Sequence, residues 1–144
     1  MCSSDLAEGA HSRDRAAALH TVTEGLRAWW HGDSHVAAKH LGEAVPVLSR
    51  VTDYPGQFAV IEDTLIDAEW HSGAQVHSER ILRDRVGAYA LPRPRDQFWL
   101  GRVLASTGRT TEGGDLLRSA RSRWVGADEN SPELRSLESM AVSM

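Results

Sequence analysis

The fold is decided by residues 25–44, which read GLRAWWHGDSHVAAKHLGEA. The same arrangement of small and large apolar residues returns 76 positions later, where residues 101–120 read GRVLASTGRTTEGGDLLRSA. The repeated positions are Gly25, Ala37, Leu41 and Ala44 in the first stretch and Gly101, Gly113, Leu117 and Ala120 in the second. Small residues let two helices approach closely, and the leucine fills the space between them. We therefore expect two helical hairpins of the same kind, each closed by a short polar turn.

A fainter copy lies between these two, about 40 residues after the first. The matching residues are Ala28, Trp30 and His31 in the first copy and Ala68, Trp70 and His71 in the middle one. The middle copy has His77 or Ser78 where the small-residue pattern has alanine. We expect the architecture or the function to depart from the repeat at this point.

Composition limits the class of protein. The chain has 144 residues, of which 41% are hydrophobic and 25% charged, and this suits a single globular domain. No apolar run approaches the roughly 20 residues that a membrane-spanning helix needs, and residues 1–9 do not resemble a secretory signal. We therefore expect a cytoplasmic protein. Cys2 is the only cysteine, which excludes an internal disulfide and a cysteine-based metal site. Almost every basic residue is an arginine, as a GC-rich bacterial genome would produce.

Caps, glycines and prolines divide the chain into seven predicted helices. They are expected over about residues 13–30, 34–50, 55–72, 74–89, 96–107, 111–124 and 132–140. Residues 1–12 are predicted to be disordered and to precede a single domain over residues 13–144. Ser12 is the predicted N-cap of the first helix. Pro46 predicts a kink or an early end in the second helix, and residues 91–95 are expected to be non-helical because of their two prolines.

Other helix starts carry cap signals of their own. The expected caps are Asp33 or Ser34 for the second helix, Thr110 or Thr111 for the sixth, and Ser131 followed by Pro132 for the last. No stretch of the chain alternates apolar and polar residues as a strand does. The predicted fold class is therefore all-α, with antiparallel hairpins in about three pairs and a short C-terminal capping helix.

This organisation resembles the tetratricopeptide-repeat family over roughly residues 16–125. The third pair carries the resemblance best, through Leu100-Gly101 and Leu104 in its first helix and Gly113, Leu117 and Ala120 in its second. The family's early tryptophan is absent at Thr21 and Gln97. The resemblance implies a superhelix whose concave groove, lined by the first helix of each pair, receives a peptide or a protein partner.

Carried over by position, the groove is an amphipathic trough. Its expected residues are Val22, Leu26, Trp29, Trp30, Glu62, Ile66, Glu69, Trp70, Arg95, Phe98 and Arg102. Tryptophans offer anchoring area, and the charged positions offer hydrogen bonds that fix the register of a bound peptide. The alternative for Trp30 and Trp70 is that they only fill gaps between adjacent helix pairs.

Signals for other chemistry are weaker. His31, Asp33, His35 and His71 lie at equivalent turns and form the alternative of a metal or polar site. Asp63 and Asp67 are four residues apart and are expected to form a solvated acidic face. The chain has no glycine-rich phosphate loop and no nucleophile elbow, and acidic residues interrupt its arginine cluster. We expect no catalysis, no cofactor and no nucleic-acid partner.

The charges are distributed unevenly along the chain. Residues 1–72 carry 5 basic and 11 acidic side chains, whereas residues 73–144 carry 11 and 9. This gradient favours head-to-tail self-association or an acidic ligand at one end of the chain, and the alternative is two solvated faces. The sequence therefore predicts a non-catalytic module that binds a protein, a peptide or its own copy. The alternatives are a small helical accessory protein or enzyme of a biosynthetic pathway, with a site at the histidine turns, and a ligand-sensing fragment of a transcriptional regulator.

Overall fold

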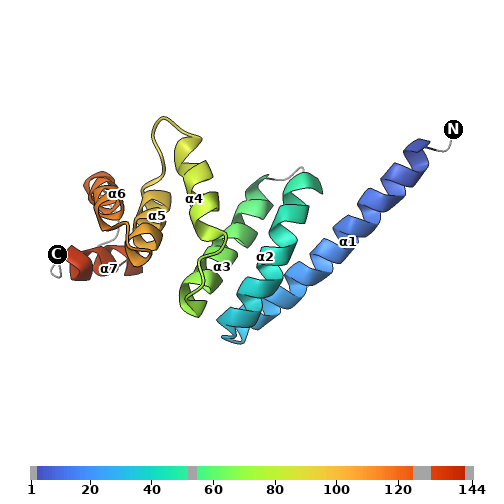
Figure 1. Cartoon of the computed structure of the whole chain (residues 1–144), viewed down its shortest axis with the longest axis horizontal. Coiled ribbons are helices and arrows are strands. Elements are labelled where there is room, and N and C mark those ends of the chain that lie inside the picture. The colour runs from blue at the N-terminus through green and yellow to red at the C-terminus, as the bar shows by residue number, and fades with distance from the viewer. Residues whose placement is uncertain (1–2, 52–54, 125–130, 142–144) are drawn as a thin grey trace. The chain divides into compact units, whose positions relative to one another are not determined.

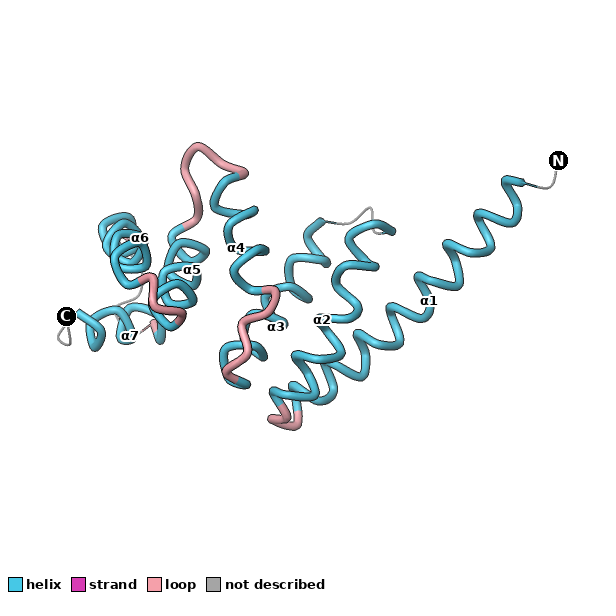
Figure 2. Tube along the Cα trace, in the orientation of Figure 1, coloured by secondary structure: helices cyan, strands magenta, loops and turns pink. Residues whose placement is uncertain are grey.

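The computed structural model describes residues 3–51, 55–124 and 131–141. Within these residues every regular element is an α-helix, as Figure 1 and Figure 2 show, so the all-α prediction is confirmed. The helices are α1 (Ser3–Trp30), α2 (Ser34–Val51), α3 (Pro55–Ser72), α4 (Ser78–Gly87), α5 (Pro94–Ser106), α6 (Thr110–Arg123) and α7 (Pro132–Ala141).

The chain divides into two compact units, residues 1–77 (unit 1) and residues 78–144 (unit 2). Unit 1 contains α1, α2 and α3, and unit 2 contains the remaining helices. The boundary lies between His77 and Ser78, the two residues at which the middle copy departs from the repeat. The expected middle pair, α3 with α4, is therefore divided between the units. That pairing, and the single domain over residues 13–144, stay predictions.

In unit 1, α1 and α2 form a hairpin around a three-residue turn. Gly32 in this turn has a φ of +81°, a left-handed conformation that glycine adopts without strain. Gly25 supplies the close approach, because a Cβ placed on it would lie 2.7 Å from Leu41 Cγ. Ala37, Leu41 and Ala44 are all buried, and α3 packs against α2 to complete the core. The first copy of the sequence pattern therefore forms a helix contact.

Unit 2 repeats this contact between α5 and α6. A Cβ placed on Gly101 would lie 2.8 Å from Leu117 Cγ, and Gly108 in the turn has a φ of +88°. The hairpin core adds Phe98, whose ring makes edge contacts with Trp99 and Trp124 at centroid distances of 5.6 and 5.8 Å. α4 packs on α5, and Leu137 of α7 joins the same core. Adjacent helices thus form antiparallel hairpins in both units.

Several helix boundaries differ from those predicted. α1 begins at Ser3, so Ser12 lies inside the helix instead of capping it, and residues 3–12 are helical. These residues include no proline, and most of them tolerate a helix. α2 continues through Pro46 to Val51 instead of ending early, because packing of Val45 and Leu48 in the core stabilises the helix on both sides of the proline.

The first residues of α5 and α6 also differ from those predicted. α5 begins at Pro94, within the stretch expected to be non-helical, since the first helical position needs no N–H donor. α6 has Arg109 as its N-cap with no side-chain cap, so neither threonine caps it. The predicted caps Asp33 and Ser131 are confirmed: Asp33 Oδ1 accepts from the Val36 amide at 3.1 Å, and Ser131 Oγ accepts from Leu134 at 3.2 Å.

Candidate binding face formed by helices α1 and α3

The side chain of Asp67 lies where α1 and α3 meet. Trp29 Nε1–H on α1 donates to Asp67 Oδ2 at 2.7 Å, across 38 residues of sequence. His71, one turn further along α3, has its Nδ1 2.9 Å from the Asp67 carbonyl oxygen and 3.5 Å from Asp67 Oδ1. A carbonyl oxygen only accepts, so the Nδ1 of His71 carries the proton. These contacts fix the Asp67 carboxylate while leaving its side chain about one-third exposed (34%).

Large apolar side chains are also exposed along α1, the helix that carries Trp29. Leu19, Leu26 and Trp30 are exposed, and Trp30 is the most open of them at 80%. Their spacings of seven and four residues place them on one side of the helix, which we call the outer stripe. A second stripe, Ala18, Val22 and Gly25, is buried. α1 therefore has two apolar stripes, of which its own unit covers only one.

Acidic residues accompany this face. Asp63 lies one helical turn before Asp67 on α3, and both are partly exposed. Residues 1–77 contain 5 basic and 11 acidic side chains, a formal net charge of −6. We call the surface made by Leu26, Trp29, Trp30, Asp63, Asp67 and His71 the α1–α3 face. It combines exposed indole rings with carboxylates.

The residues predicted to line the groove fall into three classes of exposure. Exposed are Leu26, Trp29, Trp30 and Arg95; half-buried are Glu62, Trp70 and Arg102; buried are Val22, Ile66, Glu69 and Phe98. The buried residues belong to the cores of their own units. Leu26, Trp29 and Trp30 come together at the α1–α3 face. Because Arg95, Phe98 and Arg102 lie in unit 2, a groove that spans both units stays a prediction.

Glu69 has a structural role that the sequence did not reveal. Its carboxylate, 2% exposed, accepts the His77 backbone N–H at 2.9 and 3.0 Å and lies 2.7 Å from His77 Nδ1. The imidazole of His77 also packs on α2, where a Cβ placed on Gly42 would lie 2.8 Å from its Cε1. These bonds hold residues 74–77 outside a helix, so α4 starts at Ser78 and not near residue 74. The one signal was His77 at a position where the repeat has alanine.

Arg102 and Arg95 make local contacts within unit 2. The guanidinium of Arg102 lies over the rings of Phe98 and Trp99, 5.4 and 5.0 Å from their centroids. Its partial burial lowers the pKa of Arg102 from the ordinary arginine value through desolvation. Arg95 Nε is 3.9 Å from a carboxylate oxygen of Glu133 on α7. Both side chains are thus engaged with neighbouring helices of their own unit.

The four residues considered as metal ligands are not assembled into a ligand set. In residues 3–51, 55–124 and 131–141 no group of three or more His, Cys, Asp and Glu side chains is arranged to hold a metal ion. Asp33 caps α2, and His71 contacts Asp67. His31 and His35 are exposed at the turn. Asp33 therefore has a capping role, and His71 belongs to the α1–α3 face.

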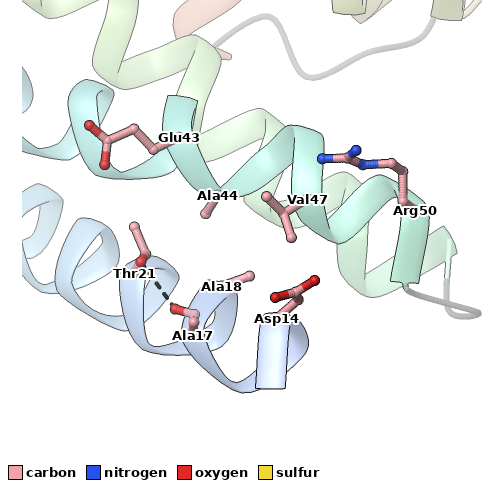
Figure 3. Close-up of a pocket in the computed structure, with 8 residues that line it drawn as sticks. All are labelled: Asp14, Ala17, Ala18, Thr21, Glu43, Ala44, Val47 and Arg50. Carbon is pink, nitrogen blue, oxygen red and sulfur yellow. Dashed lines mark hydrogen bonds between the residues drawn. The ribbon is translucent and has the colours of Figure 1, made fainter. Parts of the chain in front are cut away.

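A pocket of about 510 Å³ lies between α1 and α2 (Figure 3). It is lined by Asp14, Ala17, Ala18, Thr21, Glu43, Ala44, Val47 and Arg50. Figure 3 shows Ala44 and Val47 of α2 directed toward α1, and the Thr21 hydroxyl donates to the Ala17 carbonyl oxygen at 3.1 Å. Thr21 and Leu19 are two residues apart, about 200° around the helix. The pocket and the outer stripe are thus separate surfaces of α1.

Comparisons with family models, with curated proteins and with solved structures give no significant match to this chain.

Among the described residues, no helix combines the length and the apolar character required to cross a membrane.

Proposed function

We propose that this chain is a non-catalytic module that binds a protein partner, and that the α1–α3 face is the contact surface. One observation carries the proposal: Trp30 and Leu26 are exposed on α1, the helix whose Trp29 bonds the Asp67 carboxylate of α3. Exposed apolar residues that line up on one helix face are typical of interaction sites. Tryptophan is also among the residues that contribute most to binding energy in protein interfaces.

A tetratricopeptide-like pairing of the helices is part of this proposal. It is supported by the matching contacts of Gly25 with Leu41 and of Gly101 with Leu117, which use the same sequence positions in the two hairpins. The concave groove that such a pairing implies stays a prediction.

Site-specific crosslinking tests the contact surface. A photoreactive amino acid is placed at position 30, and for comparison at position 91, which is exposed to a similar degree (80% and 76%) but lies outside the face. We expect a crosslinked partner from the native extract at position 30 only, and we expect Leu26→Glu to abolish it. Equal crosslinking at both positions, or a product unaffected by Leu26→Glu, would reject the α1–α3 face as the contact surface.

A further inference from the structure

We propose that the partner presents a basic segment to the α1–α3 face, with an arginine or lysine side chain packed on the Trp30 indole and its charge bonded to Asp67. This inference deepens the proposed function and rests on it. The occupant is therefore defined by its chemistry as a peptide segment that combines cationic and apolar side chains.

The Asp67 carboxylate is prepared for a cation. Trp29 Nε1–H donates to one lone pair of Oδ2. A carboxylate has about four acceptor sites, so Asp67 can accept a further hydrogen bond from an incoming donor. The bond to Trp29 also fixes the side-chain rotamer before a ligand arrives, which lowers the entropic cost of binding. A guanidinium or ammonium group would form a charge-assisted hydrogen bond there.

Trp30 supplies the second half of the site. Its indole is largely exposed, and it follows Trp29 directly on the helix, at a Cα distance of about 3.8 Å. A cation placed over the face of an indole is attracted by the electron density of the ring, and tryptophan is the strongest of the aromatic residues in this interaction. The same chemistry operates inside unit 2, where the Arg102 guanidinium lies 5.0 Å from the Trp99 ring centroid.

The charge around the face favours a basic partner over an acidic one. Unit 1 carries a formal net charge of −6, and Asp63 adds a second carboxylate one turn from Asp67. The nearest arginine along α1, Arg27, is two residues from Trp29, about 200° around the helix, and one turn before Trp30. Arg27 also lies 3.8 Å from Glu24, on the same helix.

Three synthetic peptides test this inference by calorimetry. They alternate leucine with arginine, with citrulline or with glutamate, so that citrulline keeps the shape of arginine and removes its charge. We expect the arginine peptide to bind at least tenfold more tightly than the citrulline peptide, and the glutamate peptide not to bind. Equal affinity for arginine and citrulline would overturn the inference.

Matched variants locate the bound charge. Asp67→Asn keeps an oxygen acceptor for Trp29 Nε1–H while removing the negative charge, so the fold is preserved and the arginine preference is expected to disappear. Trp30→Leu keeps an apolar residue without the indole face and is expected to weaken the arginine peptide more than the citrulline peptide. Glu43→Gln, an exposed acid on α2 of the same unit, is the control. If it weakens binding as much as Asp67→Asn, the attraction is diffuse and the site is rejected.

The two proposals fail in different ways. A crosslinked partner at position 30 without any preference for arginine would leave the protein-binding function standing and remove the basic segment. A crosslink from position 30 to unit 1 of a second copy would identify self-association through the outer stripe instead, and would also overturn the inference. Loss of the position-specific crosslink rejects the contact surface itself.

Discussion

At Gly113, α5 and α6 approach so closely that only a hydrogen atom fits in the place of a side chain. A Cβ placed on Gly113 would lie 2.6 Å from the Gly101 carbonyl oxygen and 2.9 Å from the Ala105 nitrogen. Both are backbone atoms, which cannot rotate away as the end of a side chain can. The small residues of the repeated pattern are therefore requirements of helix packing.

The first prediction follows from this contact. Gly113→Ala is expected to lower the free energy of unfolding by about 1–3 kcal/mol, because the helices must separate to admit the methyl group. Urea denaturation followed by circular dichroism measures the change.

Gly87→Ala is the matched control for this substitution. Gly87 is the last residue of α4 in the same unit, and nothing lies within 4 Å of a Cβ placed on it. Replacement by alanine is expected to be neutral or slightly stabilising, because alanine has the higher helix propensity. Equal destabilisation by the two substitutions would contradict the packing argument.

The pKa of Glu79 gives a second prediction at this scale. Hydrogen bonds from Arg109 and then from Arg83 lower the pKa of Glu79 from its ordinary 4.5 to about 2. Since the folded-state pKa is the lower one, these bonds stabilise the fold above about pH 4.5 and the stabilisation is lost as the pH falls toward 2. Arg109→Ala is expected to raise the Glu79 pKa toward 4.5, as measured by NMR titration of the carboxyl carbon. If the pKa of Glu79 is the same in this variant as in the wild type, Arg109 does not bind the carboxylate in solution.

At the scale of the helix, start signals decide how the hairpins close. Asp33 Oδ1 satisfies the Val36 amide, one of the amide groups at the start of α2 that have no partner within the helix. This contact gives the residue a role in the fold in place of the metal-binding role that its neighbouring histidines suggested.

Replacement of this cap is the third prediction. Asp33→Ala is expected to destabilise the protein by about 0.5–2 kcal/mol, in the range of other lost N-caps. His35→Ala changes an exposed residue two positions away and is expected to leave the melting temperature unchanged. If both substitutions lower the melting temperature equally, or only in the absence of a chelator, the capping role is wrong.

The helices and the two hairpins could be predicted from the sequence because their signals are local. Glycine, proline and cap residues interrupt a clear helical periodicity, and the spacing from Gly25 to Leu41 returns from Gly101 to Leu117. The start of α4 could not be predicted in this way. It depends on the bonds of Glu69 to His77, and those form only when α3 is folded.

The candidate face was predictable only in part, for a similar reason. The resemblance predicted Trp29 and Trp30 as residues of a binding groove; both are exposed on α1, and the groove itself stays a prediction. Asp67 was expected to be only part of a solvated acidic face, because no spacing in the sequence relates it to Trp29. The hydrogen bond that joins them spans two helices and is a property of their packing.

For the whole molecule, the uneven distribution of charge has a consequence for self-association that can be measured in solution. Residues 1–77 have a formal net charge of −6, whereas residues 78–144 carry 11 basic and 9 acidic side chains, a net charge of +2. Opposite charges attract over about a Debye length, which is roughly 10 Å at 0.1 M salt and shorter above it.

The fourth prediction is a salt-dependent self-association between unlike units of different copies. The weight-average mass from sedimentation is expected to rise with concentration at low ionic strength and to fall toward 15.8 kDa above about 0.5 M salt, where charges are screened. Association that strengthens with salt would instead indicate apolar contacts, with the outer stripe of α1 as the first surface to examine.

The equal turns of the two hairpins restrict how this chain can evolve. Residues 31–33 and 107–109 each place one left-handed glycine at the centre of a three-residue link. Successive helical residues are about 100° apart around the axis, so one inserted or deleted residue would swing Leu41 away from Gly25 or Leu117 away from Gly101. Sequences that descend from this one can therefore differ in residue type between Gly25 and Leu41 and between Gly101 and Leu117, but not in the number of residues there. Gains and losses of length should accumulate outside residues 25–41 and 101–117.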